Sequence, residues 1–209
     1  SSASATGANF AAADSVEITA IYGWEVTNLE NSGLITTTAA ADATAAAEDG
    51  YATSNAIAAG IYLSPYSPLT VTNSGTISVD SRAATSAHYS DAEAVALAVP
   101  AGAGGTFTNS GTIAATASST GDTRVDGGGY RHAAYSAGIV AGGILSPDTA
   151  VFAATNEIPS LGFAPFNTLS NTGTISAVST VSGNAALPAG TTGSAYYYAS
   201  AIGVAFGDN

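Results

Sequence analysis

One short frame occurs four times in this 209-residue chain and constrains its fold more than any other feature. Three copies, at 71–78, 107–114 and 169–176, read apolar-x-Asn-Ser/Thr-Gly-Thr-Ile, and a looser copy at 29–36 has Leu34 in place of Thr. Repeats of a few tens of residues predict a solenoid or a propeller-like array. The copies are unevenly spaced, so the repeating unit should carry segments of variable length.

The frame has a physical interpretation as a strand with a bend. In the second copy the odd positions share one face, so Val71 and Ile77 should face the core. Asn73 should stand at a bend, and Gly75 should allow either a positive φ or close packing. A hairpin turn explains one such copy but not four in phase. We therefore expect layers whose side chains form ladders, with these members: Asn31, Asn73, Asn109, Asn171, Gly33, Gly75, Gly111 and Gly173.

A second kind of strand lies between successive frames. It is a run of Ala, Gly and β-branched residues, seen at 16–23, 55–63, 94–99, 135–141 and 199–206. Low-complexity stretches rich in Ala, Ser and Thr, such as 36–55 and 115–134, precede these runs. We expect the stretches to be loops or extra strand pairs that leave the solenoid wall.

The charge balance excludes some partners. The chain has three arginines, no lysine and 15 acidic residues, for a net charge of −12. Nucleic-acid binding needs clustered positive charge, so we expect no such partner. The most apolar window, 133–145, is too short to insert in a membrane. The absence of Cys gives no disulfide framework and no Cys-ligated metal site.

The inventory of catalytic residues is sparse. His88 and His132 have no second His at metal-ligand spacing. We expect both at the surface or in the excursions, the low-complexity stretches that leave the solenoid wall. Asp122 and Asp126 are weak Ca²⁺ candidates, since their spacing matches neither the EF-hand loop nor the nonapeptide repeat. The closest carboxylate pair is Asp91 with Glu93. We therefore expect no enzyme and no cofactor apart from this calcium candidate.

The tyrosines are the remaining residues that indicate a function. Tyr196, Tyr197 and Tyr198 alternate between two faces, so at least one ring should be exposed and available for an interface. Other tyrosines, among them Tyr62 and Tyr135, are expected in or beside loops. Aromatic rings there suit protein interfaces and sugar stacking, but we favour a structural role for them, in which they cap the ends of rungs or cover the wall of small residues.

The Asn-Ser-Gly-Thr-Ile frame, the polar excursion and the Ala-x-Gly-Ile strand together resemble the passenger repeats of bacterial autotransporter adhesins and related outer-surface proteins. The resemblance spans about residues 16–206. It implies a right-handed parallel β-helix, an extracellular location at the bacterial cell surface, and an adhesive or self-associating role. This chain departs from the family in lacking the outer-membrane barrel segment and a signal peptide, and in having long excursions.

The sequence thus predicts an all-β, right-handed parallel β-helix of about four to five rungs, with residues 1–209 as one solenoid domain, segment or subunit. Neither end resembles a polar cap, so we expect open rungs that pair with other copies or continue in a longer array. The predicted function is a non-enzymatic structural or adhesive surface protein whose partners are itself, a neighbouring cell surface or glycans. The alternatives are a carbohydrate-active β-helix enzyme and an inert autotransporter stalk.

Overall fold

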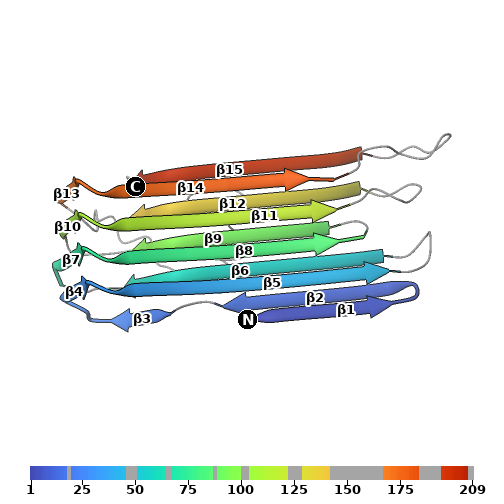
Figure 1. The fold of residues 1–209 in the computed structure, drawn as a ribbon, viewed down its shortest axis with the longest axis horizontal. Helices are drawn as coiled ribbons and strands as arrows, with labels where there is room; N and C mark the ends of the chain where they lie inside the picture. Colours follow the sequence, from blue (N-terminus) through green and yellow to red (C-terminus); the bar gives the residue numbers. More distant parts are fainter. Residues whose placement is uncertain are drawn as a thin grey trace.

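The computed structural model describes residues 1–17, 20–45, 51–64, 67–86, 89–99, 104–121, 129–141, 167–183 and 194–206. This part of the chain contains strands and no helix, and the strands form three parallel sheets (Figure 1). Sheet A consists of β1 (Ser2–Gly7), β5 (Leu34–Ala45), β8 (Thr76–Thr85), β11 (Thr112–Gly121) and β14 (Thr174–Ser182). Sheet B consists of β2 (Phe10–Glu17), β6 (Tyr51–Ser64), β9 (Tyr89–Val99), β12 (Gly129–Ala141) and β15 (Ser194–Phe206), with β3 (Ile21–Trp24) also paired to β6. Sheet C consists of β4 (Asn28–Asn31), β7 (Leu69–Asn73), β10 (Gly105–Asn109) and β13 (Thr168–Asn171).

From β5 onward the chain visits the three sheets in a fixed order, A then B then C, and each new strand lies beside the equivalent strand of the preceding repeat. Figure 1 shows the result as a flat stack in which sheets A and B form two long layers and sheet C lies at one end of both. The predicted all-β class is confirmed, and the stacked parallel sheets are compatible with a β-solenoid. No helix long and apolar enough to cross a bilayer occurs among the residues described above.

The register explains the repeated frame. Asn73 lies opposite Asn31 on one side and Asn109 on the other, and Ile77 lies likewise between Ile35 and Ile113. Parallel strands in this register place identical residues one layer apart, at about 4.8 Å. Val71 and Ile77 are fully buried, as the sequence predicts.

The low-complexity stretches differ from the expectation of loops or strand pairs that leave the wall. Most of 36–55 and 115–134 belongs to the long strands β5, β6, β11 and β12, which are themselves the wall. The reason is an alternation in side-chain size: along β5, Ala39, Ala41 and Ala43 are buried while Thr38 and Asp42 point outward.

Small side chains let sheets A and B lie close together. The core between them is mostly alanine at the end where β5 meets β6. Towards sheet C its side chains become larger and include Ile77 and Leu97. Serine hydroxyls also cross this core: Ser81 Oγ of β8 donates to the Ala56 carbonyl of β6 at 2.7 Å. Such bonds satisfy polar groups that the narrow interior would otherwise leave unpaired.

The Gly-Ile step of the second strand type has a distinct role. The register of β6 with β9 skips Gly60, and a Cβ on Gly60 would meet the side chains of Ile77 and Val79. Ile61, the next residue, also lies in the core. Two successive residues therefore face inward, and only a very small first residue fits.

The frame glycines serve close packing. A Cβ at Gly111 would lie 2.0 Å from the carbonyl oxygen of Gly75 in the neighbouring layer, and Gly75 and Gly173 are crowded in the same way. Among the described glycines, positive φ occurs instead at Gly104 and Gly105, just before and at the start of β10. Of the two explanations offered for Gly75, close packing is therefore the one that applies.

Candidate functional site

The four frame asparagines form a hydrogen-bonded ladder at the corner between sheets C and A. Asn31 Nδ2 donates to Asn73 Oδ1 at 2.7 Å, Asn73 Nδ2 donates to Asn109 Oδ1 at 2.7 Å, and Asn109 Nδ2 donates to Asn171 Oδ1 at 2.6 Å. Asn73 and Asn109 are fully buried. The repeated frame predicts a ladder of this kind. Its direction is a finding of the structure, because each step donates towards the next layer.

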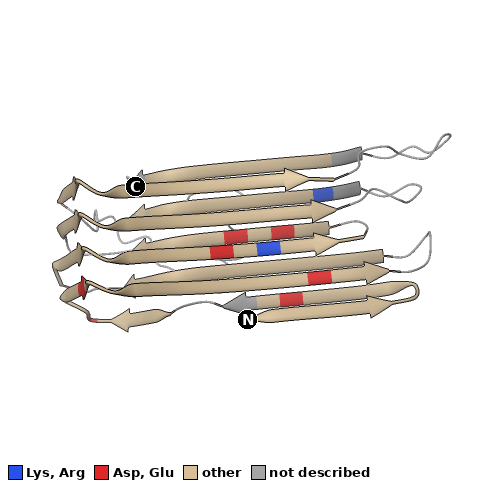
Figure 2. Ribbon diagram, in the orientation of Figure 1, with Lys and Arg blue, Asp and Glu red and all other residues tan. Residues whose placement is uncertain are grey.

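The two ends of the stack carry exposed apolar side chains, and the strands of the last layer carry no charge. The large hydrophobic side chains that are exposed belong mainly to the outermost layers: Phe10, Tyr22, Trp24, Leu34, Val178, Tyr196, Tyr197 and Tyr198. β13, β14 and β15 contain no charged residue. By contrast, β8 carries an aspartate and an arginine, and β9 carries an aspartate and a glutamate (Figure 2). Uncharged edge strands of this kind are able to pair with further strands.

The predicted tyrosine run lies in β15, in the layer farthest from the N-terminus. Tyr196, Tyr197 and Tyr198 are 64%, 37% and 45% exposed. Tyr197 points into the stack beside His132, with ring centroids 5.3 Å apart. Tyr196 and Tyr198 point to the outer face of sheet B, so the run is exposed on both faces. Tyr62 and Tyr135, expected near loops, are instead buried within strands β6 and β12.

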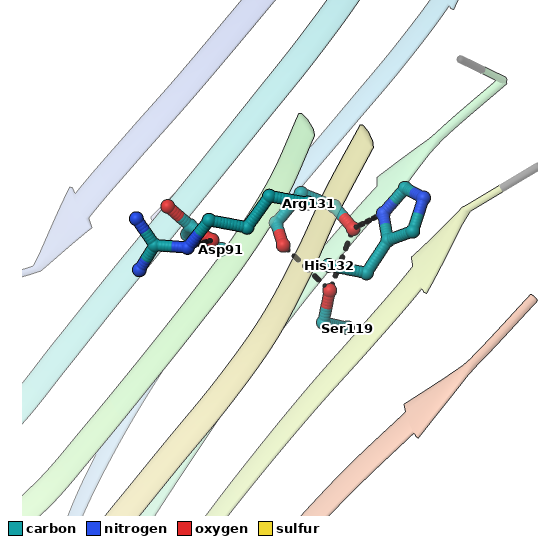
Figure 3. Close-up of polar contacts among 5 residues, drawn as sticks. Asp91, Ser119, Arg131 and His132 are labelled. Carbon is teal, nitrogen blue, oxygen red and sulfur yellow. Dashed lines mark hydrogen bonds and ion pairs between the residues drawn. The ribbon is translucent and has the colours of Figure 1, made fainter. Parts of the chain in front are cut away.

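Charged groups gather on the outer face of sheet B. Arg131 Nε of β12 lies 3.8 Å from Asp91 Oδ1 of β9, and both side chains are about two-fifths exposed. Figure 3 shows this pair on one side of the two strands and His132 with Ser119 on the other. Glu93, two residues after Asp91 on the same face, lies opposite Tyr135 of β12.

The carboxyl of Glu93 has a raised pKa. Burial raises the pKa of its carboxyl to about 7, and the negative charge of Asp91 acts in the same direction. Its Oε1 is inaccessible to solvent and has no hydrogen-bond partner there. Burial, Glu93 and Tyr198 together raise the pKa of the Tyr135 hydroxyl to about 12. Neutral Glu93 is therefore well populated near neutral pH.

The interior side of the same strands holds a polar cluster. Ser90 Oγ lies 2.7 Å from His132 Nδ1 and 2.6 Å from Ser119 Oγ, and Ser119 Oγ donates to the Ser90 carbonyl at 2.7 Å. All three side chains are fully buried, so the expectation of a surface His132 is wrong. Ser90 and His132 resemble a nucleophile with its base, but no substrate reaches a group with zero exposure, and we assign the cluster to packing.

Room for the His132 ring comes from a glycine. A Cβ at Gly121 would lie 2.0 Å from His132 Cε1. The next layer has the same arrangement of a glycine beside a ring, because a Cβ at Gly183 would approach Tyr197 Cε1 to 3.2 Å. In the preceding layer the same two columns hold Thr85 and Ser90. In two successive layers a glycine at the end of a sheet A strand thus faces a large ring of sheet B, whereas one layer earlier two smaller polar residues share the same space.

Three of the predicted positions, His88, Asp122 and Asp126, lie outside the described residues. Within those residues, no group of three or more His, Asp or Glu side chains is placed to hold a metal ion. The Glu93–Tyr135 contact was not anticipated from sequence. The signal that pointed towards it was the Asp91–Glu93 alternation, which places both carboxylates on one strand face.

Comparison with known proteins gives no relative: no family model, no curated protein and no solved structure matches this chain.

Proposed function

We propose that this chain is a non-enzymatic structural or adhesive protein of the bacterial cell surface, built as a right-handed parallel β-helix that self-associates through its end layers. The directional asparagine ladder is the observation that carries the proposal. Asn73 and Asn109 each donate to the next layer and accept from the previous one, while Asn31 and Asn171 form the two open ends of the ladder. Asn171 of one copy would therefore donate to Asn31 of the next, head to tail.

The strands of the two end layers support this geometry. A second copy would place its β4 beside β13, its β1 beside β14, and its β2 and β3 beside β15. β4 and β13 both have four residues, and β2 and β3 together pair along most of β6, as a neighbour of β15 would have to do. Head-to-tail contacts that do not close produce a filament. The extracellular location rests on the resemblance to autotransporter passenger repeats.

Negative-stain electron microscopy and light scattering of the purified chain test the proposal. We expect filaments or sheets made of 20.2 kDa subunits. Val178→Glu combined with Tyr197→Glu places two negative charges on the last layer. These charges would meet Asp14 and Glu30 in the first layer of the next copy and should abolish assembly, because a charged edge resists strand addition. Ala114→Glu, in the central strand β11, is the control and should assemble normally. A dispersed monomer at high concentration, or assembly by the end-layer variant, would contradict self-association.

A carbohydrate-active enzyme is the second candidate, and one observation favours it. Glu93, with a pKa of about 7 beside Asp91, has the protonation of a general acid. Incubating the chain with neutral and uronate-containing oligosaccharides, and analysing the products by mass spectrometry, separates the two proposals. Turnover lost in Glu93→Gln would favour the enzyme, and no turnover leaves the structural protein.

A further inference from the structure

Six side chains on the outer face of sheet B form what we call the acid–tyrosine patch. Its members come from three neighbouring strands, β9, β12 and β15: Asp91, Glu93, Arg131, Tyr135, Tyr196 and Tyr198. The register places Tyr135 beside Glu93, and Arg131 beside Tyr196. Neither proposed function uses these six residues together.

The exposed centre of the patch combines a hydrogen-bond acceptor with a donor. The Asp91 carboxylate and the Arg131 guanidinium lie 3.8 Å apart and are both partly exposed (Figures 2 and 3). A carboxylate only accepts hydrogen bonds and a guanidinium only donates them. A ligand that contacts both must therefore offer donors and acceptors within a few ångströms of each other.

Two shielded polar atoms lie beside this centre on the same face. Glu93 Oε1 and the Tyr135 hydroxyl are inaccessible to solvent, and neither has a hydrogen-bond partner within the described structure. A ligand cannot reach atoms that are shielded in this way. The groups that the patch offers to a ligand are therefore the Asp91 carboxylate, the Arg131 guanidinium and the exposed tyrosine rings.

Tyrosine rings flank the centre. Tyr198 and Asp91 lie in the same column of side chains, with only the methyl group of Ala133 between them. Tyr196 stands beside Arg131 and is the more exposed of the two rings. Exposed tyrosine rings offer an apolar face with a polar edge.

We propose that the acid–tyrosine patch binds neutral saccharides. Each sugar hydroxyl is both donor and acceptor, which suits Asp91 and Arg131 together, and the C–H face of a pyranose ring suits Tyr198. A cationic ligand would meet the Arg131 guanidinium, and an anionic one would meet two acids on a chain of net charge −12. The patch supplies the adhesive half of the proposed function and is independent of self-association.

Saturation-transfer NMR with the full chain tests this inference. The probes are the neutral trisaccharides cellotriose and N-acetylated chitotriose, with the deacetylated, cationic glucosamine trimer as the matched charge control. We expect transfer to the pyranose C–H protons of a neutral probe and weaker binding of the cationic trimer. Tighter binding of the cationic trimer, or no transfer to either neutral probe, would overturn the inference.

Variants place the binding on the patch. Tyr198→Ala should weaken the binding of the neutral probe by about tenfold, the usual size of one aromatic contact, and Asp91→Asn should weaken it as well. Tyr22→Ala removes a similarly exposed tyrosine from β3 and should bind as the unaltered chain does. Equal binding by all of these proteins would contradict the assignment. Light scattering on the same samples records assembly, so a chain that assembles but binds no sugar refutes only this inference.

Discussion

At the scale of single residues, the amide of Asn109 is the most constrained polar group in the frame. It accepts a hydrogen bond from Asn73 and donates to Asn171, and it is fully buried. An amide side chain suits this position because it carries an acceptor and donors at opposite corners of one plane. A side chain that only donates or only accepts hydrogen bonds would interrupt the ladder.

Replacing Asn109 by Ala should therefore destabilise the chain by roughly 2–3 kcal/mol, because it leaves the amide of Asn73, which is fully buried, without its acceptor. Urea unfolding followed by circular dichroism measures this change. Asn28→Ala is the control: Asn28 is exposed, bonds only weakly to Glu30, and should change stability by less than about 0.5 kcal/mol. Equal effects of the two substitutions would show that the ladder contributes nothing specific.

The ionisation of one residue, Glu93, should make the free energy of unfolding depend on pH. Its pKa is raised from the ordinary value of 4.5 to about 7 in the folded chain, so between these values the folded state holds a proton that the unfolded state has lost. As the pH rises through this window, the free energy of unfolding should fall by an amount on the order of 3 kcal/mol. Above pH 7 the contribution of Glu93 should no longer change with pH.

The comparison with Glu93→Gln isolates this contribution. The variant cannot ionise, so its stability relative to the unaltered chain should rise as the pH is raised from about 4.5 to 7. Urea unfolding at several pH values gives the difference. A difference between the two proteins that stays constant over this range would mean that Glu93 has an ordinary pKa.

At the scale of elements, the narrow core is matched in size from strand to strand. Gly121 of β11 makes room for His132 of β12, while one layer earlier the same columns hold Thr85 and Ser90. Close-packed interiors tolerate little change in local volume. The identity of one residue in such a pair therefore depends on the other.

Gly121→Thr alone should destabilise the chain by several kcal/mol, because its side chain would overlap the His132 ring. Adding His132→Ser recreates the Thr85–Ser90 pair of the preceding layer and should recover most of the loss. Urea unfolding of the two single variants and the double variant gives the coupling energy. Simple additivity of the two effects would show that the residues do not share one space.

The elements also differ in how far the sequence could predict them. The frame is recognisable because its role needs particular side chains: an amide for the ladder, and glycine where a Cβ at Gly111 would lie 2.0 Å from the backbone of the neighbouring layer. The long strands of the wall were not predicted from the sequence. Their inward residues are alanine and serine, and these differ from the outward threonines in size more than in hydropathy, so the usual alternation of apolar and polar residues is weak. The burial of His132 was missed because it depends on Gly121, eleven positions away, across the core.

At the scale of the whole molecule, self-association must overcome electrostatic repulsion. Each copy carries a net charge of −12, while the strands of the last layer, β13 to β15, carry none. The local contacts therefore favour association and the long-range field opposes it. This balance distinguishes end-layer stacking from association through salt bridges, because added salt strengthens the first and weakens the second.

Added salt should therefore promote assembly. Raising the ionic strength from about 0.01 M to 1 M shortens the Debye length from roughly 30 Å to 3 Å, which screens the repulsion between copies but leaves hydrogen bonds and apolar contacts at the end layers intact. Light scattering at fixed protein concentration should show larger particles as sodium chloride increases. The Val178→Glu, Tyr197→Glu variant should stay dispersed at low salt, where the added charges repel the acidic first layer of the next copy without screening. If salt dissociated the particles of the unaltered chain instead, ion pairs would hold the copies together and stacking of uncharged end layers would be excluded as the mechanism.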